Sequence, residues 1–349
     1  MPISDSTAMD LYSTCPQSKL YGNGREYLEA VTRTARWSDA QGCAGMLVYT
    51  DNSLVDPWLV AQLVLQQTER LSPLVAVQPA YMHPYAVAKM VTSLSFLHGR
   101  RMSLNLVAGG FRNDLLAMGD DTPHDERYAR ITEYGSILVG LLRGESVSLD
   151  GAHYQVKNLK LTPKLPDELF PVLLMSGSSP AALATARTLG ATAIRYPQDP
   201  EKEEDIERPD GVQMGLRVGI VAHEDAASAW AEAERRFPDD RQGQIMHELA
   251  MKTTDSQWHK QLSVDAAGSE GDDGSPRESD ARSPYWLHPF QQYQTFCPYL
   301  VGSYERVADE IRRYSTMGDR VLIVDIPLEE DDLVHANRVL EHVEVGSAG

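Results

Sequence analysis

Short apolar runs alternate with longer segments of helical spacing along most of the chain. The runs AGMLVYT (44–50), PLVAVQPA (73–80) and PVLLMSG (171–177) are nearly continuous in apolar residues. Strands that are buried on both faces have this pattern, and helices that alternate with them cover a parallel sheet. About eight such strand–helix units in one chain favour a closed (β/α)8 TIM barrel, an α/β fold. An open doubly wound sheet is the alternative.

The same patterns give expected bounds for each element. Strands are expected over residues 11–15, 44–50, 73–80, 102–110, 171–177, 191–196, 214–222 and 321–326. Helices are expected over residues 25–41, 55–70, 83–99, 123–144, 180–190, 224–236, 240–262, 303–317 and 329–342. Residues 145–161 alternate with a period of two around Asp150-Gly151, which predicts a hairpin with a tight turn.

Residues 263–284 interrupt the alternation of strands and helices. They are rich in Gly, Ser, Asp and Pro and contain almost no large apolar side chain. Such a segment cannot bury enough apolar surface to offset its ordering entropy, so we expect a mobile or disordered insertion. An interruption of this kind inside a barrel is typical of a loop insertion. We therefore expect a single domain over residues 1–349.

The charge of the chain argues against two classes of partner. Acidic residues outnumber basic ones by 50 to 32, and the formal net charge is −18. Such a surface repels nucleic acid and anionic lipid headgroups, so we expect no nucleic acid and no membrane partner. A phosphorylated cofactor stays compatible with this charge, because a helix N-terminus can bind phosphate within an acidic protein.

The cysteines and the first residues favour a cytoplasmic protein. Cys15, Cys43 and Cys297 are widely spaced, without a CxxC pair or a Cys/His cluster. Neither a disulfide framework nor a metal site is therefore expected. Residues 1–14 have no basic start followed by an apolar run, so we expect no signal peptide.

The segment SGSSPAALATA (176–186) is a candidate phosphate site. Gly177 allows a sharp turn after a strand, and Ser178 or Ser179 can cap the helix that Pro180 begins. A helix start of this kind offers N–H groups, hydroxyl groups and the positive end of the helix dipole to a phosphate. Simple helix capping is the alternative, because serine has that role in many proteins.

A second candidate group lies in TPHDERYARI (122–131). Thr122 and Asp125 resemble a capping box around Pro123. His124 and Tyr128 are four residues apart, so they lie on one face of a helix and could contact a ligand. A packing pair is the alternative for these two rings.

Two further polar residues stand near the ends of expected strands. His83 follows the strand 73–80, where the active-site loops of a barrel begin. Arg217 lies inside the apolar run MGLRVGIVA, where a charge is costly unless it is paired or serves a function. The sequence contains no GxSxG, HExxH, Walker or dinucleotide-binding glycine motif, which argues against several hydrolase and dehydrogenase classes.

Five segments follow one another in this order: GMLVYTDNSLVDPWLVAQLVLQQTERLSPLVAVQPAYMHP, RMSLNLVAGG, HDERY, GESVSLDGAHYQV and LLMSGSS. In their order they resemble luciferase-like flavin monooxygenases, and the alkanesulfonate monooxygenase branch is the most similar. The resemblance implies a TIM barrel with insertions at the C-terminal face. It also implies that reduced FMN, supplied by a separate NAD(P)H flavin reductase, reacts with O2 to oxygenate a small molecule.

The resemblance also assigns roles to individual residues. The residues that match the cofactor-binding positions of the family are Asp51, Ala108, His124, Tyr128, Ser178 and Ser179, of which the two serines match the phosphate site. Arg217 matches an arginine near the reacting centre, and we expect it to stabilise developing negative charge. His83 or His124 would handle protons, and His83 and Arg217 are the predicted catalytic residues.

Several residues depart from the alkanesulfonate pattern. Leu54, Gly219 and Ile326 stand where that branch has a cysteine, a histidine and a tyrosine, and HPFQQYQTFCPYL (288–300) replaces a glycine-rich loop. The flavin half of the site is kept, whereas the sulfonate half differs. A simple alkanesulfonate is therefore not the expected substrate.

The expected function is thus an FMN-dependent monooxygenase of secondary metabolism that acts on a small organic metabolite, either free or bound to a carrier. We expect a homodimer or a homotetramer. A deazaflavin-dependent oxidoreductase and a non-catalytic flavin-binding protein are the alternatives.

Overall fold

The computed structural model describes residues 9–109, 112–199, 210–253, 262 and 282–346. The chain divides into two compact units, which are described separately. The amino-terminal unit comprises Thr14–Ile194 and Pro209–Val212. The carboxyl-terminal unit comprises Met1–Ser13, Arg195–Arg208 and Gln213–Gly349.

The amino-terminal unit is organised around a parallel sheet. Its strands are β2 (Gly45–Val48), β3 (Ser72–Val77), β4 (Ser103–Val107), β7 (Val172–Ser176) and β8 (Thr192–Arg195). They pair in parallel in the order β2, β3, β4, β7, β8. Their residues are almost all buried, as expected for a parallel sheet that helices cover.

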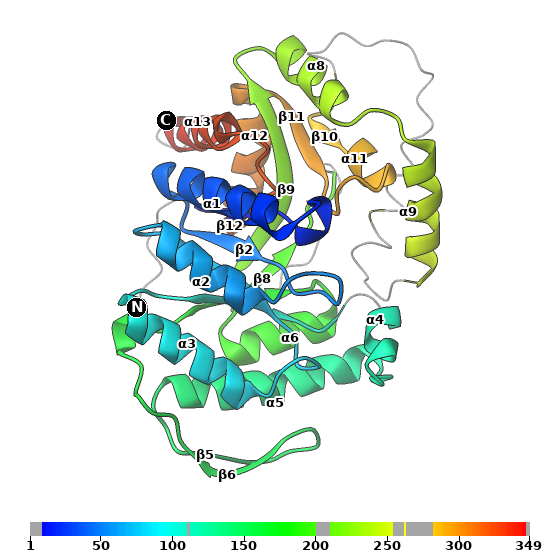
Figure 1. Ribbon diagram of the computed structural model, residues 1–349. Coiled ribbons are helices and arrows are strands. Elements are labelled where there is room, and N and C mark those ends of the chain that lie inside the picture. The colour runs from blue at the N-terminus through cyan, green and yellow to red at the C-terminus, as the bar shows by residue number, and fades with distance from the viewer. Residues whose placement is uncertain (1–8, 110–111, 200–209, 254–261, 263–281, 347–349) are drawn as a thin grey trace. The chain divides into compact units, whose positions relative to one another are not determined.

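Helices follow these strands. They are η1 (Ser18–Leu20), α1 (Gly24–Ala40), α2 (Pro57–Gln67), α3 (Pro84–His98), α4 (Arg112–Ala117), α5 (His124–Leu142), η2 (Asp167–Leu169) and α6 (Pro180–Leu189). Within the unit, α1 packs against α2, α3 against α5 and α5 against α6 (Figure 1). Proline occupies the first turn of α2, α3 and α6, where its missing N–H has no cost.

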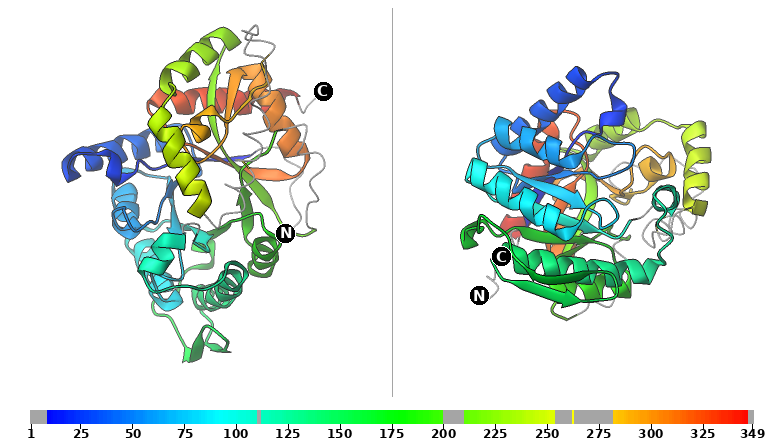
Figure 2. Two further views of the ribbon diagram at one scale, coloured as in Figure 1. Left: turned by 90° about the vertical axis from the view of Figure 1, so that its right-hand side faces the viewer. Right: turned by 60° about the horizontal axis from the view of Figure 1, so that its bottom comes forward.

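The expected hairpin is present, and its tight turn follows Asp150: the N–H of Gly151 donates a hydrogen bond of 2.9 Å to the carbonyl oxygen of Tyr154. Strands β5 (Val147–Asp150) and β6 (Gln155–Leu159) are antiparallel and run beside α5 (Figure 2). The carboxylate of Glu133 in α5 accepts hydrogen bonds from the backbone N–H groups of residues 152–154. This tertiary contact holds the turn over residues 151–154, so the hairpin prediction is confirmed, with a turn centred two residues beyond Asp150-Gly151.

The carboxyl-terminal unit contains the remaining strands. They are β1 (Asp10–Thr14), β9 (Met214–His223), β10 (Tyr285–Trp286), β11 (Tyr299–Ser303) and β12 (Asp319–Val324). β12 lies between β1 and β9, β11 pairs with β9, and these contacts are all parallel, whereas β10 is antiparallel to β11. Strand β11 is absent from the sequence prediction, and its pairing with β9 extends the sheet.

The helices of this unit are α8 (Ala226–Arg236), α9 (Arg241–Thr253), α11 (His288–Gln291), α12 (Tyr304–Thr316) and α13 (Glu330–Gly346). A core cluster forms where α8 meets β11, and it includes Trp230, Phe290 and Tyr299. Arg195 and Asp319 form a buried ion pair of 3.0 Å in this unit.

Among the described residues, five parallel strands of the amino-terminal unit (β2, β3, β4, β7 and β8) and three of the carboxyl-terminal unit (β1, β9 and β12) give the eight strands of a (β/α)8 barrel. The expected insertion at 263–284 lies outside the described residues except for 282–284, so it stays a prediction, as does the single domain. In the part of the chain that the structure describes, no helix is long and apolar enough to cross a membrane.

Candidate functional site

The end of β7 and the start of α6 form the candidate phosphate site in the amino-terminal unit. Gly177 has φ +146°, a conformation that favours glycine. Ser179 is the N-cap of α6, and its hydroxyl oxygen accepts a hydrogen bond of 3.2 Å from the N–H of Ala182. Ser178 lies between Gly177 and Ser179 and is half-buried. The sharp turn and the serine cap are both as the sequence predicts.

Tyr128 lies directly over Gly177. A Cβ atom at Gly177 would overlap the phenol oxygen of Tyr128 and would lie 2.7 Å from the Cβ of Ala182. The Tyr128 hydroxyl also donates a hydrogen bond of 3.4 Å to the carbonyl oxygen of Ser176. The turn therefore needs glycine for its backbone angle and for the space above it.

Burial raises the pKa of Tyr128 to about 12, although its hydrogen bond with Ser179 opposes that rise. Tyr128 therefore keeps its proton at neutral pH and can act as a hydrogen-bond donor. The His124 ring lies edge-on to that of Tyr128, with 5.1 Å between the ring centroids. His124 Nδ1 lies 2.7 Å from a carboxylate oxygen of Asp125. The structure thus brings the predicted pair together.

The capping box expected around Pro123 is wrong. Helix α5 begins at His124 without a side-chain cap. Thr122 instead bonds to the carboxylate of Asp120 through both its N–H and its hydroxyl group. Asp120 also accepts a hydrogen bond of 2.6 Å from Arg130, so the segment before α5 is fixed by Asp120.

Asp51 lies in the loop after β2, and the residues around it link three segments of the same unit. Its carboxylate accepts a hydrogen bond of 2.8 Å from the N–H of Ser53. The neighbouring Asn52 accepts a hydrogen bond from Tyr81, after β3, and donates one of 3.2 Å to the carbonyl oxygen of Asp114, in α4. Burial, together with the charges of Asp51 and Asp114, raises the pKa of Tyr81 to about 12.

Ala108 is buried directly after β4, next to Gly109 with φ +91°. In the same strand, Asn105 accepts a hydrogen bond of 3.0 Å from the hydroxyl group of Ser176 in β7. Asn105 is not among the predicted site residues, although it is a polar residue inside the apolar run LNLVAG, just as Arg217 is a charged residue inside an apolar run.

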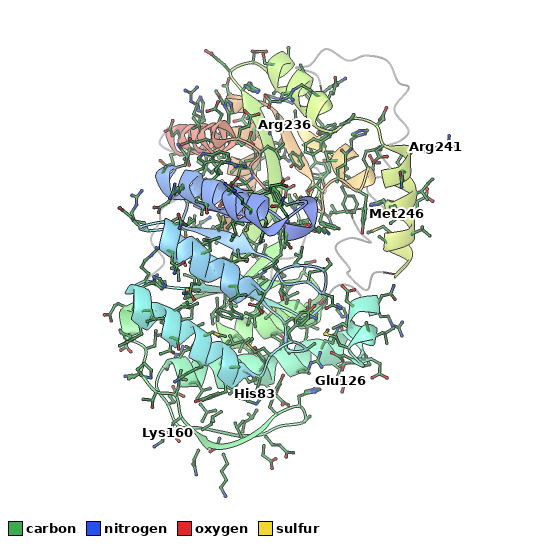
Figure 3. All side chains as sticks on the ribbon, in the orientation of Figure 1. His83, Glu126, Lys160, Arg236, Arg241 and Met246 are labelled. Atoms are coloured by element: carbon green, nitrogen blue, oxygen red, sulfur yellow. The ribbon has the colours of Figure 1, made fainter. Side chains whose placement is uncertain are left out.

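His83 is the exposed N-cap residue of α3 (Figure 3). Its Nδ1 atom accepts a hydrogen bond of 3.1 Å from the N–H of Tyr85. Its ring packs edge-on against that of Tyr154 in the hairpin loop, with 5.8 Å between centroids. These contacts give His83 a structural role at the start of α3, and its predicted catalytic role stays a prediction.

Arg217 lies in β9, in the carboxyl-terminal unit, with 11 % of its side chain exposed. Its Nη2 atom is 4.0 Å from Oδ1 of Asp325, which follows β12. The other carboxylate oxygen, Oδ2, accepts hydrogen bonds of 2.6 Å from Thr295 and 3.0 Å from Tyr299. The guanidinium carbon lies 5.9 Å from the ring centroid of Tyr196. We refer to these five residues as the Arg217 cluster.

Gly219 explains how Tyr299 reaches this cluster. A Cβ atom at Gly219 would fall inside the ring of Tyr299. The tyrosine ring therefore occupies the space that a side chain at position 219 would need. Asp325, Thr295 and Tyr299 were not predicted, because their contacts join segments that are far apart in the sequence.

The tyrosines of the Arg217 cluster are neutral at physiological pH. Burial raises the pKa of Tyr299 well above its usual value, and the charge of Asp325 raises it further. Burial also raises the pKa of Tyr196 to about 12, although Arg217 opposes that rise.

No group of three or more His, Cys, Asp or Glu residues within the described ranges could hold a metal ion.

The family model described as luciferase-like monooxygenase matches residues 9–320. The chain belongs to the luciferase-like monooxygenase family. The expectation drawn from the five ordered segments is confirmed at the level of the family, whereas the alkanesulfonate branch stays a prediction.

This luciferase-like monooxygenase is similar to 4-(gamma-L-glutamylamino)butanoyl-[BtrI acyl-carrier protein] monooxygenase BtrO of Niallia circulans. The two proteins are 34% identical over 339 residues, which cover 95% of this chain and 96% of that protein. It is similar in structure to EDTA monooxygenase (EmoA) from Chelativorans sp. BNC1, with a TM-score of 0.68, 16% identity and coverage of 98% and 95% of the two chains. It is also similar to an F420-dependent secondary alcohol dehydrogenase, with a TM-score of 0.64, 15% identity and coverage of 96% and 99%. These likenesses confirm the (β/α)8 barrel.

Proposed function

We propose that this protein is a monooxygenase that uses reduced FMN and O2, with the FMN phosphate bound at Ser178 and Ser179. The turn at Gly177 carries the proposal. Its glycine admits the hydroxyl group of Tyr128 beside the start of a serine-capped helix, and a helix start can bind phosphate. Reduced FMN would supply the electrons that activate O2.

The residues around this turn fit a bound flavin phosphate. Tyr128 keeps its proton at neutral pH, so it can donate a hydrogen bond to an anionic oxygen. His124 is oriented by Asp125 and is the better placed candidate to move a proton, because His83 caps α3. We also propose that Ala108 and Asp51 line the flavin position, and that Arg217 stabilises negative charge that develops on the substrate.

The substrate that we propose is an amino-acid-derived acyl group on a carrier protein. The support is the 34% identity with a relative whose name specifies a 4-(gamma-L-glutamylamino)butanoyl group on an acyl-carrier protein. A separate NAD(P)H flavin reductase would supply the reduced FMN. A homodimer or homotetramer stays the expected assembly.

The test is an oxygenase assay with the purified protein, a flavin reductase, NADH, FMN and 18O2. The substrates are 4-(γ-glutamylamino)butanoyl carrier protein and, for comparison, 1-octanesulfonate. We expect a carrier-bound product 18 Da heavier than the substrate, without release of sulfite from the sulfonate. Efficient sulfite release, or an unlabelled acyl group after complete oxidation of NADH, would contradict the proposal.

A deazaflavin-dependent oxidoreductase is a second candidate, favoured by the likeness to an F420-dependent alcohol dehydrogenase. Both cofactors contain phosphate, so the phosphate site does not separate them. Fluorescence titration with FMN and with F420 separates them by ring system. Our proposal requires tighter binding of FMN, and tighter binding of F420 would favour the second candidate.

A further inference from the structure

The carboxylate of Asp325 is held in one orientation toward Arg217. Two hydroxyl groups, from Thr295 and Tyr299, donate to its Oδ2 atom. The remaining oxygen, Oδ1, is the one that lies 4.0 Å from the Arg217 guanidinium. A carboxylate with two donors on one oxygen cannot rotate without losing both hydrogen bonds.

The sequence around the cluster is built to supply these donors. Thr295 and Tyr299 belong to the segment between α11 and β11 and to β11 itself. The phenol of Tyr299 reaches Asp325 because Gly219 in β9 leaves room for its ring. A larger residue at position 219 would displace the ring and remove the Tyr299 donor.

We propose that Asp325 is a specificity determinant: it offsets the positive charge of Arg217 and thereby excludes from the Arg217 cluster substrate groups that are already anionic, such as sulfonates and carboxylates, while Arg217 can still donate to a carbonyl oxygen on which charge develops. The group that the Arg217 cluster accepts is then a neutral acyl group, such as an amide or thioester carbonyl. This inference rests on the proposed function in one respect, because it takes Arg217 to act on the substrate.

The charges of the cluster support this exclusion. Arg217 and Asp325 carry opposite charges, and the phenols of Tyr196 and Tyr299 stay neutral. Both charged side chains are largely buried, with 11 % and 14 % exposed, so water screens them weakly. An incoming anion would be repelled by Asp325 and would lose its own hydration. A neutral carbonyl can accept a hydrogen bond from the arginine with a smaller loss of hydration.

The test measures binding of two matched probes to the full-length, flavin-free protein by isothermal titration calorimetry. The probes are 1-octanesulfonate, which is anionic, and octanamide, which is neutral. Asp325→Asn keeps the size of the side chain and removes its charge. We expect this variant to bind the sulfonate roughly ten-fold more tightly or better, because a repulsive charge near Arg217 is gone. Octanamide affinity should change less than two-fold, about the scatter expected for an uncharged probe.

Two milder variants cover the case in which Asp325→Asn does not fold. Tyr299→Phe and Thr295→Val each remove one donor and keep the shape of the side chain, so the Asp325 carboxylate is held less firmly toward Arg217. Each variant should therefore raise sulfonate affinity by about three-fold, which is less than the effect of removing the charge of Asp325. Tyr314→Phe is the matched control, because the Tyr314 hydroxyl is another tyrosine donor in the same unit, bonded at 3.0 Å to the carbonyl oxygen of Gln198. It should leave both affinities unchanged.

The gain in sulfonate affinity should also require Arg217. In the double variant Asp325→Asn/Arg217→Met, the gain in sulfonate affinity should disappear. Unchanged sulfonate affinity in Asp325→Asn and Tyr299→Phe, or an equal gain for octanamide, would overturn the inference. Because no flavin and no turnover enter the measurement, a failure of the oxygenase assay would leave this result standing, and the reverse also holds.

Discussion

Both units place a tyrosine over a glycine, but the two tyrosines are held in different ways. Tyr128 lies over Gly177 at the start of α6 and donates to a backbone carbonyl. Tyr299 lies over Gly219 within the sheet and donates to the carboxylate of Asp325. The first contact shapes a backbone turn, whereas the second orients a charge.

The two glycines are therefore required for different reasons. Gly177 has a positive φ in addition to the crowding above it, whereas Gly219 lies in strand β9 and the atoms nearest to its Cβ position belong to the ring of Tyr299. A local turn can be recognised from its own residues. A strand glycine that makes room for the ring of a residue far away in the sequence cannot be recognised in this way. Variants of the two glycines and the two tyrosines test this difference.

The largest effect is expected for Gly177→Ala. The added Cβ meets Tyr128 and Ala182, and the backbone angle is strained for alanine, so we expect a loss of about 3 kcal/mol or more and no FMN binding. The control is Gly190→Ala, which has φ +65° and nothing within 4 Å, and it should cost only about 1 kcal/mol. Urea unfolding and FMN titration measure both variants. Equal costs would show that crowding by Tyr128 has no importance.

Gly219→Ala is expected to cost about 2 kcal/mol, because the new methyl group must displace the Tyr299 ring. The same change in a Tyr299→Ala background should cost much less, since the ring is already gone. A double-mutant cycle of unfolding free energies measures this coupling. Additive costs would contradict the proposed competition between the two residues.

Removal of the hydroxyl groups of the two tyrosines should also lower the stability by different amounts. Tyr299→Phe removes a hydrogen bond to a charged carboxylate and should cost about 1.5–3 kcal/mol, whereas Tyr128→Phe removes a longer bond to a neutral carbonyl and should cost about 0.5–1.5 kcal/mol. Urea unfolding of the two variants gives the comparison. The reverse order would show that Asp325 does not depend on Tyr299.

A smaller effect is expected from pH at the segment before α5. Burial raises the pKa of Asp120, but hydrogen bonds from Arg130 and Thr122 outweigh it, so the net pKa lies below the usual 3.8. The stabilisation is present above about pH 4 and is lost as the pH falls through the lower folded-state pKa. Asp120→Asn should therefore flatten the loss of stability below about pH 4. The exposed neighbour Asp121, changed to Asn, should leave that slope in place.

Elements whose ends depend on local residues were predicted well. Helix α6 was expected over 180–190 and spans Pro180–Leu189, since Ser179 and Gly190 mark its ends in the sequence. Strand β11 was not predicted, because the short run YLVGS becomes a strand through pairing with β9. The hairpin is predicted correctly, but its turn lies two residues beyond Asp150-Gly151, where Glu133 of another element accepts hydrogen bonds from its N–H groups.

The residues of the candidate site also fall into those that the sequence indicates and those that it does not. The Ser179 cap and the Gly177 turn follow from adjacent residues, so the sequence indicates them. The printed ion-pair partner of Arg217 is Asp325, whose own hydrogen-bond donors come from residues 295 and 299, and only the folded chain brings these segments together. Sequence reasoning identified the arginine by its cost inside an apolar strand, but it had no signal for the carboxylate that compensates it.

The central claim is that the start of α6 binds the phosphate of FMN, and the most direct test compares FMN with riboflavin. In Ser178→Ala/Ser179→Ala, we expect FMN affinity to fall at least ten-fold more than riboflavin affinity, since hydrogen bonds to a charged group contribute about 1.5–3 kcal/mol each. Ser303→Ala is the control, because Ser303 caps α12 by the same kind of bond, and it should change neither affinity. Equal weakening of FMN and riboflavin in the double variant would contradict the claim.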